Sequence, residues 1–406
     1  MKLTPRMALR NVLRNRRRSL LTGLMMAGGY VLFSATLGIS DGTYGSIIDM
    51  FTRSRTGHAQ VHAAGYLDRP SLYKAIKDPA RAGRVLDSIP EVAAWAPRVY
   101  SPSLAFAGSK TVGAQIMGID PARERKAMRL ETQLSSGAFV ADSPSAGVVI
   151  SARLAAALNI KTGDEFSLIG QGADGSIAND NFRVAGVLSA TESAFEGPWC
   201  LMHIDKAREF MALGGRAHEL ALVFTDYRRA REDAAIAAAA LSDPALDVQP
   251  WQVTEKDFYQ AMLLDKKGGD ITNYVIMLIV AIGVLNTVLM AVLERTREYG
   301  VLKALGTRPG SVFLLIMTEV LILTLISCAA GAAGALALNH YLATHGIPIP
   351  NPVSYGGVKF TVMLSAVTLE TFTRPAWTVL AAALAVGVFP ALKAARITPV
   401  KALSSR

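Results

Sequence analysis

The sequence predicts an α-helical membrane protein with four transmembrane helices and a large α+β domain inserted between the first helix and the second. Three observations predict this class. The 406-residue chain is 51% hydrophobic but only 18% charged, whereas soluble proteins of this size are usually less apolar. Four apolar runs are long enough to cross a bilayer. The long interval after the first run alternates between strand-like and helix-like patterns.

The four apolar runs give the predicted spans. A hydrocarbon core of about 30 Å needs about 20 helical residues. The spans are residues 20–39, 274–293, 312–338 and 375–392. We expect Pro390 to limit the last one, because proline interrupts a helix. The first run is longer than the apolar core of a secretory signal peptide, so we interpret it as a span that stays in the protein.

Basic residues at the span ends predict the orientation. Residues 1–19, 294–311 and 393–406 contain fifteen Lys and Arg and two Glu, a net charge of +13, whereas the whole chain carries +10. Because positive loops stay on the cytoplasmic side, we predict that these three segments are cytoplasmic. Residues 40–271 and the loop 339–374 are then external. The pI near 9.6 reflects topology, and we expect no nucleic-acid binding.

The external domain shows short elements of both kinds. Residues 41–55 are expected to continue the first helix, and Ser151 is a candidate N-cap for a helix. The Gly- and Asn-rich residues 170–181 predict a hairpin connection. Predicted strands are residues 58–62, 104–107, 115–119, 147–150, 166–169 and 182–188, and predicted helices are 151–158 and 228–241.

Motifs for catalysis or nucleotide binding are not found. A phosphate-binding loop needs the pattern GxxxxGK[ST], and the nearest match, "LAFAGSKT" at residues 104–111, lacks both glycines. His58 and His62 lie on one face of a predicted strand, but without a third ligand we expect ordinary exposed histidines. Glu192 and Glu196 are expected in a solvated loop. We therefore expect no enzyme, no bound metal and no cofactor in this chain.

Glu319 is the charged residue of the third span. A carboxylate inside a span is costly and has either a partner or a function. One interpretation is a proton relay. We favour a structural role, in which Glu319 lies near the inner surface and contacts Asn286, Thr287 or a basic residue of the tail, because no second acid lies within the spans. The cysteines Cys200 and Cys328 are in different regions and are not expected to pair.

Residues 294–306, "ERTREYGVLKALG", form a charged segment between the second and third spans. Gly306 is a natural helix stop. Tyr299, Leu302 and Leu305 recur at intervals of three and predict an apolar ridge. A helix with a ridge and charges is typical of docking into a groove on a partner; an interfacial helix in the lipid headgroups is the alternative.

Several of these motifs resemble those of one family. "NTVLMAVLERTREYGVLKALG" (residues 286–306), "ALRNVLRNRRRSLLT" (8–22), which is similar to the family's elbow helix, and "AARITPVKAL" (394–403) resemble the permease subunits of type VII ABC transporters, the MacB/LolC/LolE/FtsX superfamily. "VVISARLAAALNIKTGDEFSLIG" and "FRVAGVLSAT" are similar to its periplasmic domain. Length and "TGHAQVHAAGY" (56–66) are closer to lipoprotein-releasing permeases. Macrolide-efflux members typically have the ATPase fused ahead of the first span, where nineteen residues stand here.

The resemblance implies a mechanical transporter in the bacterial inner membrane with a periplasmic domain. Two permeases, identical or paralogous, dimerise, and a dimeric ABC ATPase that binds ATP and Mg²⁺ docks on their coupling helices. The coupling residues would be Glu294, Arg295, Arg297, Glu298, Tyr299, Leu302 and Leu305. ATP-driven closure would pass along the first two helices to the periplasmic domains.

In the lipoprotein-releasing branch, acyl chains enter a cavity between the first two helices of the two permeases and are passed to a periplasmic carrier. Candidate wall residues here are Met25, Met26, Tyr30, Phe33, Tyr274, Met277 and Val284, with ordinary helix packing an equal alternative for each. The family's carrier-binding hook bears a proline, whereas the matching hairpin, with Gln171, Asp174 and Ile177, has none. Alternatives are a tripartite efflux permease with an adaptor, for small molecules or peptides, and a signalling permease that controls a cell-wall hydrolase.

Overall fold

The computed structural model describes residues 8, 10, 14, 16–190, 195, 197–355 and 358–398. Contacts between Cα atoms divide the chain into two compact units. The first, here called the span unit, comprises Met1–Tyr44, Met262–Pro348 and Val362–Arg406. The second, here called the α/β unit, comprises Gly45–Ala261 and Ile349–Thr361. Most of residues 1–19, predicted as the elbow helix, and the tail from residue 399 lie outside the described residues.

Four long helices contain the predicted spans. Each is long and apolar enough to cross a membrane, and together they are the four such helices in the described part of the chain. They are α2 (Arg16–Phe51), α9 (Lys256–Glu294), α11 (Pro309–His345) and α12 (Leu369–Arg396), and the short α10 (Thr296–Ala304) connects the second to the third. The predicted continuation of the first helix is confirmed, since α2 extends to Phe51 and a π-helical turn, η1 (Thr52–Thr56), follows it.

Two details of the spans differ from expectation. Pro390 does not end the last span, because α12 continues through it to Arg396. Proline removes only one backbone donor, and within a bundle neighbouring groups satisfy the carbonyl that is freed. The predicted loop 339–374 is mostly ordered: α11 runs to His345, and the strands β11 (Ile347–Tyr355) and β12 (Val358–Met363) pair with each other.

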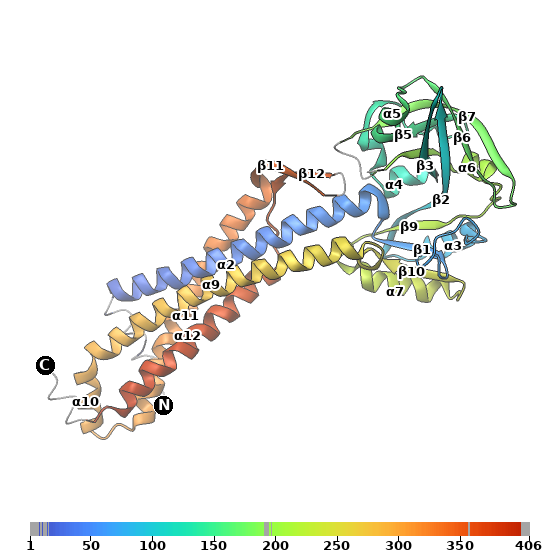
Figure 1. The fold of residues 1–406 in the computed structure, drawn as a ribbon. Helices are drawn as coiled ribbons and strands as arrows, with labels where there is room; N and C mark the ends of the chain where they lie inside the picture. The colour runs from blue at the N-terminus through green and yellow to red at the C-terminus, as the bar shows by residue number, and fades with distance from the viewer. Residues whose placement is uncertain are drawn as a thin grey trace. The chain divides into compact units, whose positions relative to one another are not determined.

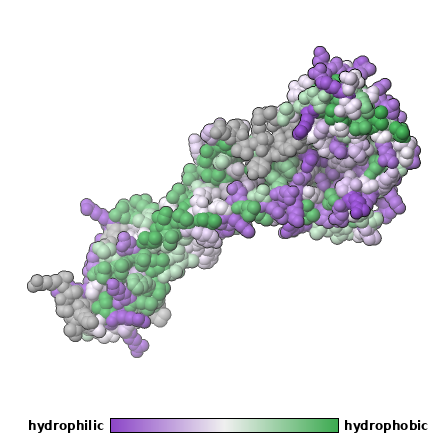
Figure 2. Space-filling model, in the orientation of Figure 1, coloured by the Kyte–Doolittle hydropathy of each residue, from purple (hydrophilic) through white to green (hydrophobic). Residues whose placement is uncertain are grey.

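Small residues bring the helices of the span unit close together, and Figure 1 shows α2, α9, α11 and α12 side by side. A Cβ built on Gly29 of α2 would lie 2.2 Å from Val280 Cγ2 of α9, and one on Gly331 of α11 would lie 2.9 Å from Tyr30 Cβ. In lipid no hydrophobic driving force acts between helices, and the van der Waals contacts made at such close approach stabilise their association instead. The remaining apolar side chains face outward, and they give the hydrophobic surface of the helices in Figure 2.

Polar side chains also join helices inside the span unit. Ser34 Oγ donates to the carbonyl of Thr371 at 2.7 Å, Asn339 Nδ2 donates to Ser34 Oγ at 3.0 Å, and Ser365 Oγ donates to Asn339 Oδ1 at 2.8 Å. Ser34 and Asn339 are fully buried. Interhelical hydrogen bonds of this kind stabilise helix association in apolar surroundings by about 0.6 to 2 kcal/mol each.

The α/β unit is built on one mixed ten-stranded sheet. The path through it runs β10-β1-β9-β2-β3-β8-β5-β7-β4, and β6 pairs with β2 and β7. The strands are β1 (Ala59–Ala63), β2 (Val92–Ala107), β3 (Lys110–Ile119), β4 (Leu134–Gly137), β5 (Gly147–Ile150), β6 (Glu165–Gln171), β7 (Ile177–Leu188), β8 (Trp199–His203), β9 (Glu219–Phe224) and β10 (Leu246–Pro250). The helical elements are α3 (Pro79–Leu86), α4 (Pro121–Ala127), η2 (Leu130–Gln133), α5 (Ala152–Leu158), α6 (Ile204–Phe210), η3 (Tyr227–Arg229), α7 (Ala230–Leu241) and α8 (Trp251–Thr254).

The strand and helix predictions for this unit are confirmed in kind, with shifted ends. Ser151 is the N-cap of α5, and its side chain accepts a hydrogen bond from Leu154 N. The "LAFAGSKT" segment is the end of β2, a turn with Gly108 at φ 58°, and the start of β3. The connection predicted over residues 170–181 is shorter, because cross-strand pairing extends β6 and β7 as far as the pair Gln171 and Ile177.

Candidate functional site

The segment between α9 and α11 is a short helix with defined ends. α9 ends at Glu294, α10 occupies Thr296–Ala304, and Gly306 has φ 92°, a conformation that residues with a Cβ rarely adopt. Gly306 N and Thr307 N donate to the carbonyls of Lys303 and Leu302, so the last turn is closed in the usual manner for a glycine stop. Pro309 at the first turn of α11 then starts the next helix.

One face of this segment is fixed by a buried ion pair. Arg295 Nη1 lies 3.2 Å from Glu319 Oε1 and 3.3 Å from Oε2, and Arg295 is only 5% exposed. The structural interpretation of Glu319 was therefore right in kind, but the basic partner comes from the charged segment and not from the tail. Burial, followed by the charge of Glu319, raises the pKa of the neighbouring Tyr299 to about 12, so its hydroxyl stays protonated at physiological pH.

Two further contacts tie α10 to the ends of the chain. Lys303 Nζ donates to the carbonyls of Ala395 and Ile397, at 2.8 and 2.7 Å, at the end of α12. A lysine at this place satisfies carbonyls that a helix end leaves free. Arg14 Nη2 lies 2.7 Å from Glu298 Oε1, and both side chains are exposed. In the sequence, Lys303 and Arg14 are two of many basic residues near the span ends, and no motif predicts these contacts.

The predicted apolar ridge is only partly available to a partner. Tyr299 is 4% exposed and belongs to the buried core of the spans, and Leu302 packs against that core, so the ridge interpretation is wrong for these two residues. The reason is that α10 turns this face back onto α9, α11 and α12 of its own chain. The exposed side of the segment is instead formed by Glu294, Arg297, Glu298, Val301 and Leu305.

A small cavity lies behind α10. It holds about 50 Å³ and is lined by Ser19, Thr22, Thr287, Val288, Ala291, Val292, Tyr299, Ile316, Glu319, Val320 and Leu323. Glu319 therefore faces both Arg295 and a pocket with four hydroxyl side chains, those of Ser19, Thr22, Thr287 and Tyr299. A volume of this size accommodates water but not an acyl chain.

The predicted cargo-cavity residues divide into two groups. Met26, Tyr30, Phe33 and Val284 are buried within the chain, so within one copy they pack helices together and form no open wall. Their spacing did not distinguish an inner helix face from an outer one. Met277 is partly buried against the same core, whereas Met25 and Tyr274 are 43% and 75% exposed and remain available to lipid or a partner.

The predicted carrier-binding residues lie at the exposed end of the β6–β7 hairpin. Ile177 is 83% exposed, and Gln171 Nε2 donates to the Tyr73 hydroxyl at 3.3 Å. Asp174 Oδ1 accepts from Ser176 N and Oγ at 3.0 and 2.6 Å, and these hydrogen bonds lower the pKa of Asp174. The turn is thus short, polar and closed on itself.

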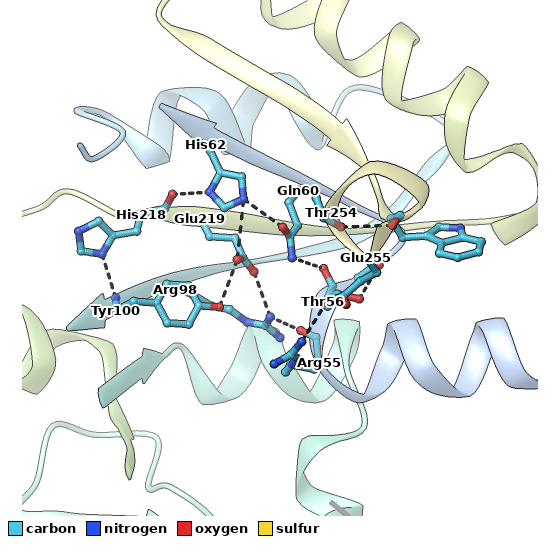
Figure 3. Close-up of polar contacts among 12 residues, drawn as sticks. Arg55, Thr56, Gln60, His62, Arg98, Tyr100, His218, Glu219, Thr254 and Glu255 are labelled. Atoms are coloured by element: carbon cyan, nitrogen blue, oxygen red, sulfur yellow. Dashed lines mark hydrogen bonds and ion pairs between the residues drawn. The ribbon is translucent and has the colours of Figure 1, made fainter. Parts of the chain in front are cut away.

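The histidines predicted to be exposed are buried. His58 and His62 are 2% and 1% exposed because β1 lies between β9 and β10 in the sheet. His62 Nδ1 contacts the carbonyl of His218 at 2.9 Å and its Nε2 contacts Gln60 Oε1 at 3.0 Å, as Figure 3 shows. Among the residues searched, which are those the structure describes, no group of His, Cys, Asp or Glu has a geometry for a metal ion.

The remaining predictions on single residues concern two cysteines and two acids, and the structure describes only the cysteines. Cys200 is buried in β8 and Cys328 lies in α11, and both are free. Burial raises the pKa of the Cys200 thiol. Glu192 and Glu196 lie outside the described residues. A buried cluster around Arg98 was not predicted, because Arg98 belongs to no motif and lies in a strand whose other residues are mostly ordinary apolar ones.

Comparison with known proteins agrees with this architecture. A family model described as the MacB-like periplasmic core domain matches residues 19–241, which is more than half of the chain, and one described as the FtsX-like permease C-terminal matches residues 271–399. The periplasmic region of MacB from Actinobacillus actinomycetemcomitans is among the similar solved structures, with a TM-score of 0.37 and 14% identity over 50% of this chain and 94% of that one.

Curated relatives include proteins of different kinds. The lipoprotein-releasing system transmembrane protein LolC of Xylella fastidiosa (strain Temecula1) is 24% identical over 399 residues, which is 94% of this chain and 92% of the relative. The LolC protein of Neisseria meningitidis serogroup B is 23% identical over 64% of this chain and 63% of its own length. The pyoverdine export ATP-binding/permease protein PvdT of Pseudomonas aeruginosa is 35% identical, but over only 32% of this chain and 17% of its own.

Proposed function

This chain belongs to the family of ABC transporter permeases with a MacB-like periplasmic core and an FtsX-like C-terminal domain, and from that premise we propose that it extracts lipid-anchored cargo, of the lipoprotein class, from the outer leaflet of the inner membrane. The energy comes from a separate dimeric ABC ATPase that binds ATP and Mg²⁺. The released cargo passes to a periplasmic carrier. The observation that carries the proposal is the similarity to lipoprotein-releasing LolC proteins, which extends over 94% of this chain.

The docking site for the ATPase is the exposed side of α10. Arg295, Tyr299 and Lys303 hold the helix against the spans, so a force on its exposed side reaches α9, α11 and α12 without rearranging the segment. Glu298 and Leu305 lie on the exposed side. This combination of a fixed inner face with a free outer face supports the role of a coupling helix.

The work required is consistent with an ATP-driven machine. Moving an acyl chain from the bilayer into water costs about 0.8 kcal/mol per methylene, so a 16-carbon chain costs on the order of 10 kcal/mol. An apolar holding site must offset most of that cost. In this proposal the site forms between two copies or paralogues of the chain, from outward-facing residues of α2 and α9 such as Met25, Leu32, Tyr274 and Leu278, which are all at least 43% exposed.

A second candidate function is export of small molecules or peptides through an adaptor and an outer-membrane duct. The short polar turn between β6 and β7 favours it, because the turn offers a carrier only one large apolar side chain, Ile177. The 35% identity of PvdT over 130 residues also favours it, although it covers a third of the chain.

Purification of the complex from native membranes, followed by mass spectrometry of co-purifying molecules, distinguishes the two candidates. We expect an ABC ATPase and acylated protein or peptide cargo. A complex that contains the ATPase but only small soluble molecules would favour export. A preparation without any ATPase would contradict both.

A further inference from the structure

At the π-helical turn η1, which ends α2 and lies within the α/β unit, four consecutive carbonyl groups accept hydrogen bonds from residues outside the turn. A helix normally leaves its last four carbonyls without a partner inside the helix. The carbonyl of Thr52 accepts from Gly57 N (2.7 Å), the hydrogen bond that closes the turn itself. The carbonyls of residues 53–56 accept, in order, from Arg129 N (2.8 Å), Gln133 Nε2 (2.9 Å), Arg98 Nη1 and Gln60 Nε2 (3.0 Å). Every donor belongs to the α/β unit, and three of them are side chains.

Arg98 is the centre of this arrangement (Figure 3). It is fully buried, and its Nε and Nη2 donate to the two carboxylate oxygens of Glu124 at 2.6 and 3.0 Å. Its Nη1 donates to Glu219 Oε1 at 3.0 Å, a contact that Figure 3 draws. The same Nη1 reaches the carbonyl of Arg55. The C-terminal end of a helix carries partial negative charge, so the guanidinium also balances the helix dipole. Only arginine offers this fork of donors.

The start of α9 is joined to the same unit in a different way. Glu255 (φ −117°, ψ 51°) breaks the helix between α8 and α9. Its carboxylate lies 3.0 Å from Arg55 Nη2, and both side chains are partly exposed. Phe258 stacks on Phe51 with ring centroids 4.3 Å apart. Stacked rings and an exposed ion pair tolerate sliding, whereas hydrogen bonds to buried carbonyls are directional.

Buried side-chain atoms that lack a hydrogen bond occur at the second junction. Among the described residues, Trp251 Nε1 and Gln252 Oε1 in α8 are such atoms, and so is His58 Nε2 beside them; Arg53 Nε, which is also unpaired, belongs to η1 at the first junction. His58 is beside α8 because its carbonyl accepts from Trp251 N at 3.0 Å. Buried polar atoms without partners are rare in native structures, and one explanation for them is local strain that a second arrangement would relieve.

From this contrast we propose that Arg98 and Gln133 are positioning residues that fix the end of α2 to the sheet, and that the break at Glu255 is a pivot for α9. The proposal rests on the proposed function, in which the helices move during the ATPase cycle. In that cycle the sheet follows α2 as one body, while α9 changes its angle at Glu255. In this proposal α2 therefore moves the sheet, and α9 accommodates the movement by a change of angle.

Spin-label distances in the full chain, reconstituted with its ATPase in lipid nanodiscs, test the proposal. The background carries Cys200→Ala and Cys328→Ala. Both label pairs lie within the α/β unit. One joins the end of α2 to the loop after α3 (Ser46→Cys with Ser88→Cys), and the other joins the start of α9 to that loop (Gln260→Cys with Ser88→Cys). We expect a narrow distance distribution for the first pair and a broader one for the second. On trapping with ADP and vanadate, only the second distance shifts.

Two variants test the named residues. Gln133→Leu removes one donor without leaving a buried charge, and Gln133→Glu is its matched control of similar size that also lacks the amide donor. We expect both to broaden the first distance distribution at least twofold, while the thermal midpoint of Gln133→Leu stays within a few degrees of wild type. We expect Arg98→Met to broaden the first distance distribution more than Gln133→Leu does. Arg98→Lys should broaden it less than Arg98→Met but more than wild type, since lysine lacks the fork of donors.

Each outcome has a definite meaning. If the two pairs have equally broad distributions without nucleotide, or if the first pair shifts on trapping as much as the second, the proposal is overturned. The same holds if Gln133→Leu leaves the first distribution unchanged. ATP hydrolysis by the reconstituted complex is measured in parallel, and its absence contradicts the proposed function while the nucleotide-free distances still decide the anchoring.

Discussion

At the scale of single residues, two charged side chains that lie in apolar surroundings each have a partner of opposite charge. Glu319 in α11 has Arg295, and Arg98 in the sheet has Glu124 and Glu219. Removing one member of a buried pair typically costs about 3 to 5 kcal/mol, because the other charge is left uncompensated. The sequence singled out Glu319, since an acid in an apolar run is conspicuous. It could not single out Arg98, because arginine is common in chains and only the fold shows its burial.

His58 gives the α/β unit a dependence on pH. Burial lowers the pKa of His58 to about 4 from an ordinary value near 6.5, and its Nδ1 accepts a hydrogen bond from Phe224 N at 2.9 Å. Below pH 6.5 the unfolded chain takes up this proton and the folded chain does not. Stability should therefore fall from pH 6.5 to pH 4, by about 3 kcal/mol for this residue.

Thermal unfolding of the full chain in detergent between pH 7.5 and 4.5 measures this effect. His58→Asn keeps an acceptor for Phe224 N but does not titrate, so its midpoint should fall less on acidification than that of wild type. His218, whose pKa is also lowered by burial, should leave a residual dependence of the same sign. His340→Asn, at an exposed position, is the control, and equal slopes for all three proteins would contradict the prediction.

At the scale of elements, helix contacts in the span unit depend on single glycines. Gly28 and Gly29 are neighbours in α2, yet a Cβ on Gly29 would meet Val280 at 2.2 Å while one on Gly28 would meet nothing within 4 Å. Apolar composition predicted both helices, but composition does not state which face of α2 meets α9. The face of α2 that meets α9 is determined by how the helices pack in the folded bundle.

A matched pair of alanine substitutions tests the contact. Gly28→Ala should stabilise α2 or leave it unchanged, because alanine is better than glycine in a helix by up to about 1 kcal/mol. Gly29→Ala should destabilise the protein by about 1 to 3 kcal/mol, because α2 and α9 must move apart. Thermal midpoints from fluorescence-detected size exclusion give the comparison, and equal midpoints would show that the contact is not required.

The exposed side of α10 should determine coupling to the ATPase. Glu298→Lys and Leu305→Asp alter exposed positions and leave the Arg295–Glu319 pair in place, so membrane insertion should persist. We expect ATPase binding or stimulated hydrolysis to fall at least tenfold. Leu104→Asp, at an exposed position of the α/β unit, should have no effect. Co-purification of the ATPase and hydrolysis rates provide the measurement, and full activity of both α10 variants would rule out this docking site.

At the scale of the whole molecule, charge predicts how the chain is inserted. The basic ends and the segment around α10 should face the cytoplasm, and the α/β unit should face the periplasm. In a variant with both native cysteines replaced, Ser88→Cys in intact cells should react with a membrane-impermeant maleimide. Lys393→Cys, at an exposed position of α12, should react only after permeabilisation. The opposite pattern would invert the topology and remove the basis of the proposed function.

The membrane class, the four spans, the inserted domain and the family could be predicted from the sequence, because they depend on composition, charge and local motifs along the chain. Which side chains face inward could not be predicted before the fold was known. Tyr299 and Met26 are buried, Met25 and Tyr274 are exposed, and His58 and His62 lie inside the sheet. The physical reason is that a helix or strand pattern fixes the faces of an element, whereas the neighbour that covers each face comes from residues far away in the chain. The joint between α2 and the sheet is the clearest case, since residues 52–56 meet donors that lie up to 79 positions away.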